Sequence, residues 1–233
     1  MTVYLTADME QDCPPYLNTW RGMEEGAPSL LELVAEEQVP TTFFATGQAA
    51  RRYPDLTARM ASNGHELGCH GDTHRSFAEL TPAEGEREIQ DASRSLRAFG
   101  DVVSFRAPYL RLPSAMLRTL SAEGYRLDSS QGRHKALGIR IHSDNGILRV
   151  PASITSSTLR WPAWLRNPLL ARLQDPVVLF VHPWEFVDLR RERVRIDCRF
   201  KTGETALSCL RETIRFFKKR GATFARMRDC LHA

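Results

Sequence analysis

The chain has 233 residues, of which 42% are hydrophobic, and its formal net charge is +4. This composition is that of a globular protein with a buried core, and the length suits one large domain, which we expect to span residues 1–233. The mild positive charge comes without a clustered lysine and arginine stripe and without a recognisable nucleic-acid motif. DNA and RNA are therefore not expected partners.

Two features of the sequence bear on its compartment. The longest apolar run, Val177–Val181, is far too short to span a bilayer, and the chain opens directly into a strand-like segment without a charged region and cleavage site. The five cysteines are widely spaced and lack a C-x-x-C pair, which indicates reduced thiols rather than a disulfide framework or a zinc finger. We therefore expect a cytoplasmic protein.

Short apolar runs alternate along the chain with longer segments of helical period. Strands are predicted at residues 3–7, 41–45, 65–69, 102–105, 125–127, 177–181 and 223–225. Helices are predicted at residues 28–38, from 54 to about 64, and at 82–99, 114–123 and 204–220. Thr81 and Glu84 have the spacing of a capping box at the start of the third helix. This repetition predicts a parallel sheet whose length suits a barrel or partial barrel.

The alternation fails between residues 132 and 175, where Trp161 and Trp164 lie among prolines and arginines. We interpret this segment as an irregular insertion over one end of the barrel. The stretch 159–173 could also touch an anionic membrane surface, although a lid over a ligand pocket or ordinary core packing explains the tryptophans equally well.

Polar clusters follow five of the predicted strands, which is where parallel α/β folds present catalytic groups. The clusters begin at Asp8, His70, Arg106, Asp128 and His182. Each has a simple structural explanation when taken alone, because an acidic run is often a solvated loop and a histidine pair is often a surface feature. Their joint occurrence favours a catalytic site.

His70 and His74 are spaced so that both imidazoles can face one point from a single helical turn. A carboxylate from another strand end would complete a site of two histidines and one acid, with positions left open for water. Arg106 could be a surface arginine at a strand end. Near an acidic pair, however, its fixed charge would keep a catalytic aspartate ionised and oriented.

His182 directly ends the most apolar predicted strand, and a polar imidazole in that position needs a partner. It could be a core histidine bonded to a neighbour. Asp128 could be only the cap of the turn that follows it. It could also be the partner that raises the pKa of His182 and makes it a proton donor.

In this order the motifs resemble those of the polysaccharide deacetylase family, also called the NodB-homology family or carbohydrate esterase family 4. The resemblance rests on the acidic motif after the first strand, His70-x-x-x-His74, an Arg106-x-Pro-Tyr109 segment, an Asp-Ser-Ser strand end and the late strand ending in His182. Residues 105–108, 127–130 and 181–185 resemble the exopolysaccharide-associated branch. Residues 19–28 resemble the branch that deformylates an undecaprenyl-linked aminoarabinose.

The resemblance implies a distorted, incomplete (β/α) barrel that holds Zn²⁺, or a similar divalent ion, through His70, His74 and an acid. The first motif of the family usually contains adjacent aspartates, of which the first is the base and the second a ligand. Here the pair is split, so the resemblance implies Asp8 as the base and Glu10 as the ligand, with Asp12 as the substitute ligand.

The same resemblance implies that Asp8 takes a proton from the attacking water, that His182 protonates the leaving amine, and that the backbone N–H of Tyr109 stabilises the oxyanion. We therefore expect a metal-dependent hydrolase that removes an N-acetyl group from a sugar or sugar-containing biosynthetic intermediate. The expected substrates are N-acylated sugars, sugar nucleotides or lipid-linked sugars, the last at the inner membrane face. The alternatives are a deformylase of a lipid-linked aminosugar, a hydrolase of a non-sugar amide or ureide, and a metal-free binding module.

Overall fold

The computed structural model describes residues 1–135 and 138–232, so that residues 136–137 of the expected insertion and residue 233 lie outside the described part. The central strand is β1 (Thr2–Met9), which pairs in parallel with β2 (Thr41–Ala45) and β8 (Val177–Val181). These three strands are buried along nearly their whole length, as expected for a parallel sheet that is covered on both faces.

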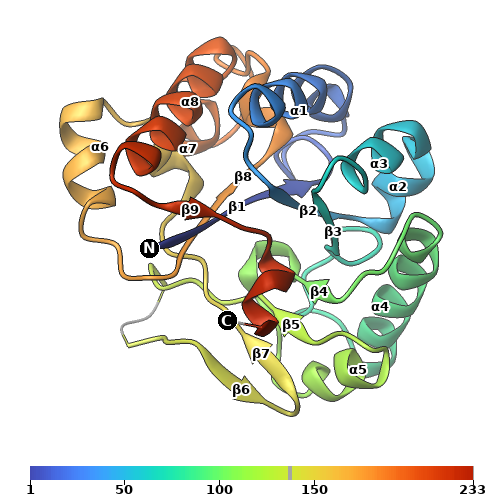
Figure 1. The fold of residues 1–233 in the computed structure, drawn as a ribbon. Helices are drawn as coiled ribbons and strands as arrows, with labels where there is room; N and C mark the ends of the chain where they lie inside the picture. The colour runs from blue at the N-terminus through green and yellow to red at the C-terminus, as the bar shows by residue number, and fades with distance from the viewer. Residues whose placement is uncertain (136–137, 233) are drawn as a thin grey trace.

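The sheet extends from these strands in the order β6-β7-β5-β4-β3-β2-β1-β8, with β9 beside β1. The remaining strands are β3 (Glu66–Cys69), β4 (Ser104–Phe105), β5 (Leu127–Asp128), β6 (His142–Asp144), β7 (Ile147–Arg149) and β9 (Thr223–Phe224). The two ends of the sheet approach each other where the Ser153 N–H donates to the Val178 carbonyl at 2.9 Å. The sheet therefore curls into an incomplete barrel, which confirms the predicted fold class (Figure 1).

Helices lie around the outside of the curled sheet (Figure 1). They are α1 (Ala27–Glu36), α2 (Gly47–Arg52), α3 (Pro54–Met60), α4 (Pro82–Arg97), α5 (Met116–Ala122), α6 (Ala163–Leu170), α7 (Ile196–Arg199) and α8 (Glu204–Lys219). The largest apolar core includes side chains from both layers, such as Val3 of β1, Leu30 of α1 and Ile214 of α8. None of the helices within residues 1–135 and 138–232 has the length and apolar character needed to cross a bilayer.

Local sequence signals account for most of these elements. Strands β2 and β8 have the predicted bounds, and the capping box of Thr81 and Glu84 opens α4 as predicted. Helix α2 is absent from the predicted elements because its six residues begin with Gly47 and offer only alanines as apolar side chains. Thr46 nevertheless caps it by accepting the N–H of Ala49 at 3.1 Å.

The segment between residues 132 and 175 is more regular than predicted. Strands β6 and β7 form an antiparallel hairpin, and β7 pairs with β5 and so extends the sheet. Asn145 and Gly146 connect them with φ values of 51° and 77°, the backbone that an Asn-Gly hairpin turn requires. The expectation of an irregular segment is therefore wrong for β6 and β7. The Asn-Gly turn signal was present in the sequence, but the strand pattern on either side of it is weak.

Candidate active site

The carboxyl ends of the parallel strands meet at one edge of the sheet, because all of these strands run in the same direction. Asp8 lies near the end of β1, His70 directly follows β3, and His182 directly follows β8. Together with Glu10 and His74 they line one cavity of about 970 Å³. Residues that are far apart in the sequence therefore share one site, as predicted.

Glu10, His70 and His74 place one ligand atom each within 4.8 Å of one another. Glu10 Oε2 lies 3.2 Å from His70 Nε2 and 2.5 Å from His74 Nε2. The Nδ1–H of His70 donates to the Arg106 carbonyl at 2.7 Å, which directs the lone pair of Nε2 toward Glu10. Within the described residues, His74 Nδ1 is buried without a hydrogen-bond partner. Two imidazoles and one carboxylate are a donor set that fits a catalytic zinc ion.

Glu10 is held from its other side by the turn that follows β8. The indole Nε1–H of Trp184 donates to Glu10 Oε1 at 3.1 Å, so that Oε2 is left to face the histidines. Burial alone would raise the pKa of the Glu10 carboxyl, but the charge of His74 and the close contacts with both histidines hold it well below its usual range. Glu10 is therefore an ionised, oriented carboxylate.

Asp12, the substitute ligand, has a different set of contacts. Its Oδ1 accepts the N–H of Gly22 at 2.7 Å and its Oδ2 accepts the hydroxyl of Thr19 at 2.7 Å. Gly22 begins a short π-helix, Gly22–Gly26, that packs directly on the turn after β8. A Cβ on Gly22 would come within 2.5 Å of the backbone nitrogen of Trp184. The structure thus brings Glu10, and not Asp12, to the two histidines.

Asp8 is paired with Arg106 as the sequence suggested. The Nη1 of Arg106 donates to Asp8 Oδ1 at 2.7 Å and to the hydroxyl of Thr6 at 2.7 Å, and its Nη2 donates to Ser129 at 3.0 Å. The side chain of Arg106 is 0% exposed and that of Asp8 5%. The second oxygen of Asp8 lies 4.0 Å from His182 Nε2 and faces the cavity.

Asp128 does not contact His182, and the predicted pairing of these two residues is wrong. The Asp128 carboxylate accepts from Arg149 Nε at 2.9 Å and from the hydroxyl of Ser130. Strands β4, β3, β2 and β1 separate β5 from β8 in the sheet, so the two strand ends are not neighbours. Ser130 in turn accepts the N–H of Ala107 at 2.7 Å, and Asp128 thereby braces the loop that follows β4.

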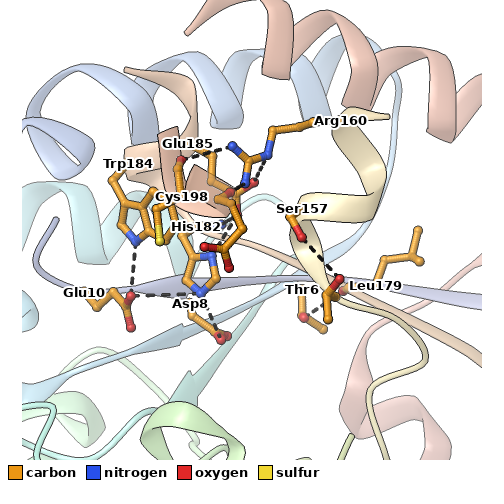
Figure 2. Close-up of polar contacts among 12 residues, drawn as sticks. Thr6, Asp8, Glu10, Ser157, Arg160, Leu179, His182, Trp184, Glu185 and Cys198 are labelled. Atoms are coloured by element: carbon orange, nitrogen blue, oxygen red, sulfur yellow. Dashed lines mark hydrogen bonds and ion pairs between the residues drawn. The ribbon is translucent and has the colours of Figure 1, made fainter. Parts of the chain in front are cut away.

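The carboxylate beside His182 is Glu185, from the same turn (Figure 2). The Nδ1–H of His182 donates to Glu185 Oε1 at 2.7 Å, and the ring of Trp184 stacks on the imidazole at 4.6 Å between centroids. Burial opposes the charged imidazole, but the hydrogen bond to Glu185 and the negative charges of Glu10, Glu185 and Asp8 raise the pKa of His182 to about 9. Glu185 carries no predicted role, although its spacing of three residues from His182 on one turn is a usable signal.

Tyr109 follows Arg106 on the loop after β4 and lines the cavity. Its backbone lies in the left-handed region, with φ of 59°, a conformation that residues other than glycine rarely adopt. Its ring meets the edge of His74 at 4.8 Å between centroids, and the Lys135 ammonium donates to its carbonyl. The loop is thereby fixed beside the metal-ligand cluster.

The fold and the site together define a class of protein, the incomplete (β/α) barrels that carry a cluster of histidines and carboxylates at the carboxyl ends of their strands. The family profile described as Polysaccharide deacetylase matches residues 2–127. This chain belongs to the polysaccharide deacetylase family, which confirms the resemblance. His182 and Glu185 lie beyond the matched residues.

Individual relatives agree with this assignment. Over 85 residues the chain is 36% identical to a chitooligosaccharide deacetylase of Sinorhizobium fredii (strain NBRC 101917 / NGR234), a match that covers 35% of this chain and 40% of that protein. The structure resembles that of Puue allantoinase with a TM-score of 0.74 at 16% identity, over 98% of this chain and 88% of the other. It resembles a family 4 carbohydrate esterase from Streptomyces lividans in complex with acetate with a TM-score of 0.66 at 17% identity, over 97% and 92% of the two chains. At these identities the structural likeness shows the fold.

Proposed function

We propose that this protein is a metal-dependent hydrolase that removes the acetyl group from the nitrogen of an N-acetylated amino sugar. The observation that carries the proposal is the convergence of the cluster of Glu10, His70 and His74 with Asp8 and His182 on one cavity. The relative from Sinorhizobium fredii, which is named a chitooligosaccharide deacetylase, supports the choice of an acetylated sugar.

The cluster would hold one divalent ion, and Zn²⁺ suits its two imidazole nitrogens and one carboxylate oxygen best. When bound, the ion would polarise the amide carbonyl and lower the pKa of a water molecule. The chain itself keeps the ligands in position, because the Arg106 carbonyl orients His70 and the Trp184 indole orients Glu10.

The remaining residues move protons and stabilise charge. Asp8, kept ionised and oriented by Arg106, would accept the proton of the attacking water. His182 would donate a proton to the amide nitrogen as the carbon–nitrogen bond breaks, which releases a free amine and acetate. The backbone N–H of Tyr109 would donate to the developing oxyanion. In this scheme Asp128 supports the loop of Tyr109 and takes no part in proton transfer.

Two cations on the outer side of the cavity favour a sugar that carries phosphate, such as a sugar nucleotide or a lipid-linked sugar. Arg111 and Lys135 both line the cavity next to Tyr109. Burial and, after it, the neighbouring charge of Arg111 lower the pKa of the Lys135 ammonium. An anionic group bound between the two side chains would relieve this repulsion.

The proposed site of action is the cytoplasm at the inner membrane face, and exposed side chains of helix α6 support the membrane contact. Its side chains Trp164, Leu165 and Leu169 are 78%, 40% and 37% exposed. Exposed large apolar side chains of this kind suit the interface of a bilayer. Co-sedimentation with anionic vesicles should therefore weaken in a Trp164→Ser, Leu165→Ser variant, and unchanged co-sedimentation, or none by the natural protein, would exclude this contact.

Two other substrates would suit the same residues. A formyl group on a lipid-linked aminosugar presents the same amide to Asp8 and His182, and the fold shared with Puue allantoinase keeps a ureide in consideration. A binding module without catalysis has no use for a carboxylate and an imidazole beside a metal-ligand cluster. It is therefore the reading that the site supports least.

A mass-spectrometric screen of the zinc-loaded protein would separate these substrates. The set should contain N-acetyl and N-formyl sugars in free, nucleotide-linked and lipid-linked form, together with a ureide. We expect loss of acetyl from at least one phosphate-bearing sugar, with the Asp8→Asn variant as an isosteric inactive control. Hydrolysis of the ureide or of formyl sugars alone would overturn the acetyl assignment.

A further inference from the structure

The turn after β8 contributes a second residue to the site in addition to the proton donor His182. We infer that Glu185, itself held in place by Arg160, is the positioning carboxylate that orients His182 toward the amide nitrogen of the substrate. This inference rests on the proposed function, and it adds two residues to it to which the sequence analysis assigned no role.

Glu185 fixes the orientation of the His182 ring. Glu185 Oε1 lies 2.7 Å from the ring Nδ1 and 3.1 Å from the backbone nitrogen of His182. An ionised carboxylate only accepts hydrogen bonds, so Nδ1 carries a proton and this hydrogen bond favours the observed ring orientation. The opposite nitrogen, Nε2, then lies 4.0 Å from Asp8 Oδ2 and 4.0 Å from Glu10 Oε1, and it points into the space between base and ligand (Figure 2).

Arg160 explains how Glu185 can stay ionised in this place. The Arg160 Nε lies 3.1 Å from Glu185 Oε2, and both side chains are 2% exposed. Burial alone would raise the pKa of the Glu185 carboxyl, but the charge of Arg160 and the contact with His182 hold it below its usual range. The terminal nitrogens of Arg160 donate to the carbonyls of Asp197, Cys198 and Phe200 at 2.7, 3.1 and 2.6 Å.

A buried ion pair is a costly way to stabilise a fold, because both groups lose their hydration. Because fold stability alone does not explain such a pair, its contacts indicate what Glu185 and Arg160 do in the site. One oxygen of Glu185 accepts a hydrogen bond from His182, and the other forms an ion pair with Arg160 Nε without a hydrogen bond, while the two terminal nitrogens of Arg160 donate to the backbone of α7 and its flanks. The pair connects the proton donor rigidly to a segment that lines the cavity, and Asp128, the other carboxylate considered for this role, is held by Arg149.

The Glu185→Gln variant tests the inference most directly. An amide keeps the size of the side chain but presents an N–H₂ group as well as an acceptor, so that His182 loses its fixed orientation. We expect kcat for an N-acetyl sugar to fall by at least roughly tenfold, and by no more than the loss of about a hundredfold or more that we expect on removal of His182, with KM little changed. An activated ester, whose leaving group needs no proton, should lose much less.

Glu66→Gln is the matched control. Glu66 is also a buried carboxylate, but it lies at the amino end of β3, where it accepts from Thr42 and Ser104. Its variant should lower thermal stability and leave kcat unchanged. If both glutamine variants lowered kcat equally on amide and ester, the loss would come from the fold, and the inference would be wrong.

A double variant separates positioning from structural support. If Glu185 acts only through His182, adding Glu185→Gln to His182→Ala should cause no further loss of kcat, whereas an independent role would make the two losses multiply. If Glu185→Gln folds poorly, Arg160→Lys can be used in its place, because it leaves Glu185 unchanged and alters only the residue that holds it. It should reproduce the same loss on the amide and the same small effect on the ester, and wild-type kcat in either folded variant would overturn the inference.

Proton NMR gives a readout that does not depend on the proposed function. The Nδ1–H of His182, hydrogen-bonded to a buried carboxylate, should give a downfield, slowly exchanging signal that disappears in Glu185→Gln and in His182→Ala. Absence of this signal from the natural protein would contradict the contact itself. If the signal is present but no N-acetyl sugar is hydrolysed, the proposed function fails while the geometry stands.

Discussion

The two walls of the cavity differ in how tightly their side chains are held. The inner wall, formed by Asp8, Glu10, His70 and His182 at the strand ends, is buried apart from His182, whose side chain is 14% exposed, and each side chain has at least one fixed partner. The outer wall, formed by residues 109–111 and 134–135, is largely exposed. This contrast suggests that the inner wall performs the chemistry and the outer wall selects the substrate.

The largest effect should come from the base on the inner wall. Asp8→Asn keeps the shape of the side chain but removes its ability to take a proton, so we expect a loss of turnover of roughly a thousandfold with metal content unchanged. Single-turnover assays together with elemental analysis would measure both quantities. Loss of metal in this variant, with metal retained in Glu10→Ala, would exchange the roles of the two acids.

His182→Ala should have the next largest effect, about a hundredfold on an amide and less on an activated ester. Because its pKa is raised to about 9, the natural protein keeps His182 protonated below that pH and loses the donor above it. Turnover should therefore fall as the pH rises through this region, and a divalent ion beside Glu10 would move the fall to lower pH. An amide profile without an alkaline decline would remove His182 from the role of proton donor.

The outer wall should respond differently. Replacing Arg111 and Lys135 by glutamine should raise KM for a phosphate-bearing sugar by about tenfold and leave the KM of an uncharged sugar nearly unchanged. Because Lys135 also donates to the Tyr109 carbonyl, any loss of kcat should be the same for both sugars. The effect on KM should shrink as salt concentration increases. Equal changes of KM for charged and uncharged sugars would show that these cations do not recognise phosphate.

Cys69 should show the smallest effect, although it directly precedes His70. Burial raises the pKa of its thiol to about 12, so the group stays protonated at neutral pH and is a poor nucleophile. We expect Cys69→Ala to keep kcat within about twofold of the natural protein, since the substitution leaves every contact of the inner wall in place. Abolished turnover with metal and fold intact would instead indicate a covalent acyl-enzyme.

The sequence predicted the catalytic residues of the inner wall better than the residues that hold them in position. Apolar runs located the main strands, and the polar residues directly after them could be expected to meet because parallel strands end at one edge. The pairing of Asp8 with Arg106 followed from the same reasoning. Segments such as α2 and β6 were missed because they are short and carry little periodic signal.

The failure at Asp128 has a physical cause. Its choice as the partner of His182 used only the fact that both residues end strands, whereas sheet order decides which strand ends are neighbours. Glu185 was close in sequence, but its role depends on Arg160, which comes from the segment before α6 and was taken for part of an irregular insertion. Contacts of this kind depend on tertiary packing that no local pattern encodes.

The most direct test of the proposed metal-dependent deacetylation is acetate release from an N-acetylated amino sugar by zinc-loaded protein, measured beside the same protein after chelation and beside a His70→Ala, His74→Ala variant. We predict that chelation stops the release, that added zinc restores it, and that the folded double variant neither retains stoichiometric metal nor releases acetate. Acetate release that continues at the same rate after chelation or in the double variant would contradict the metal site and the mechanism built on it.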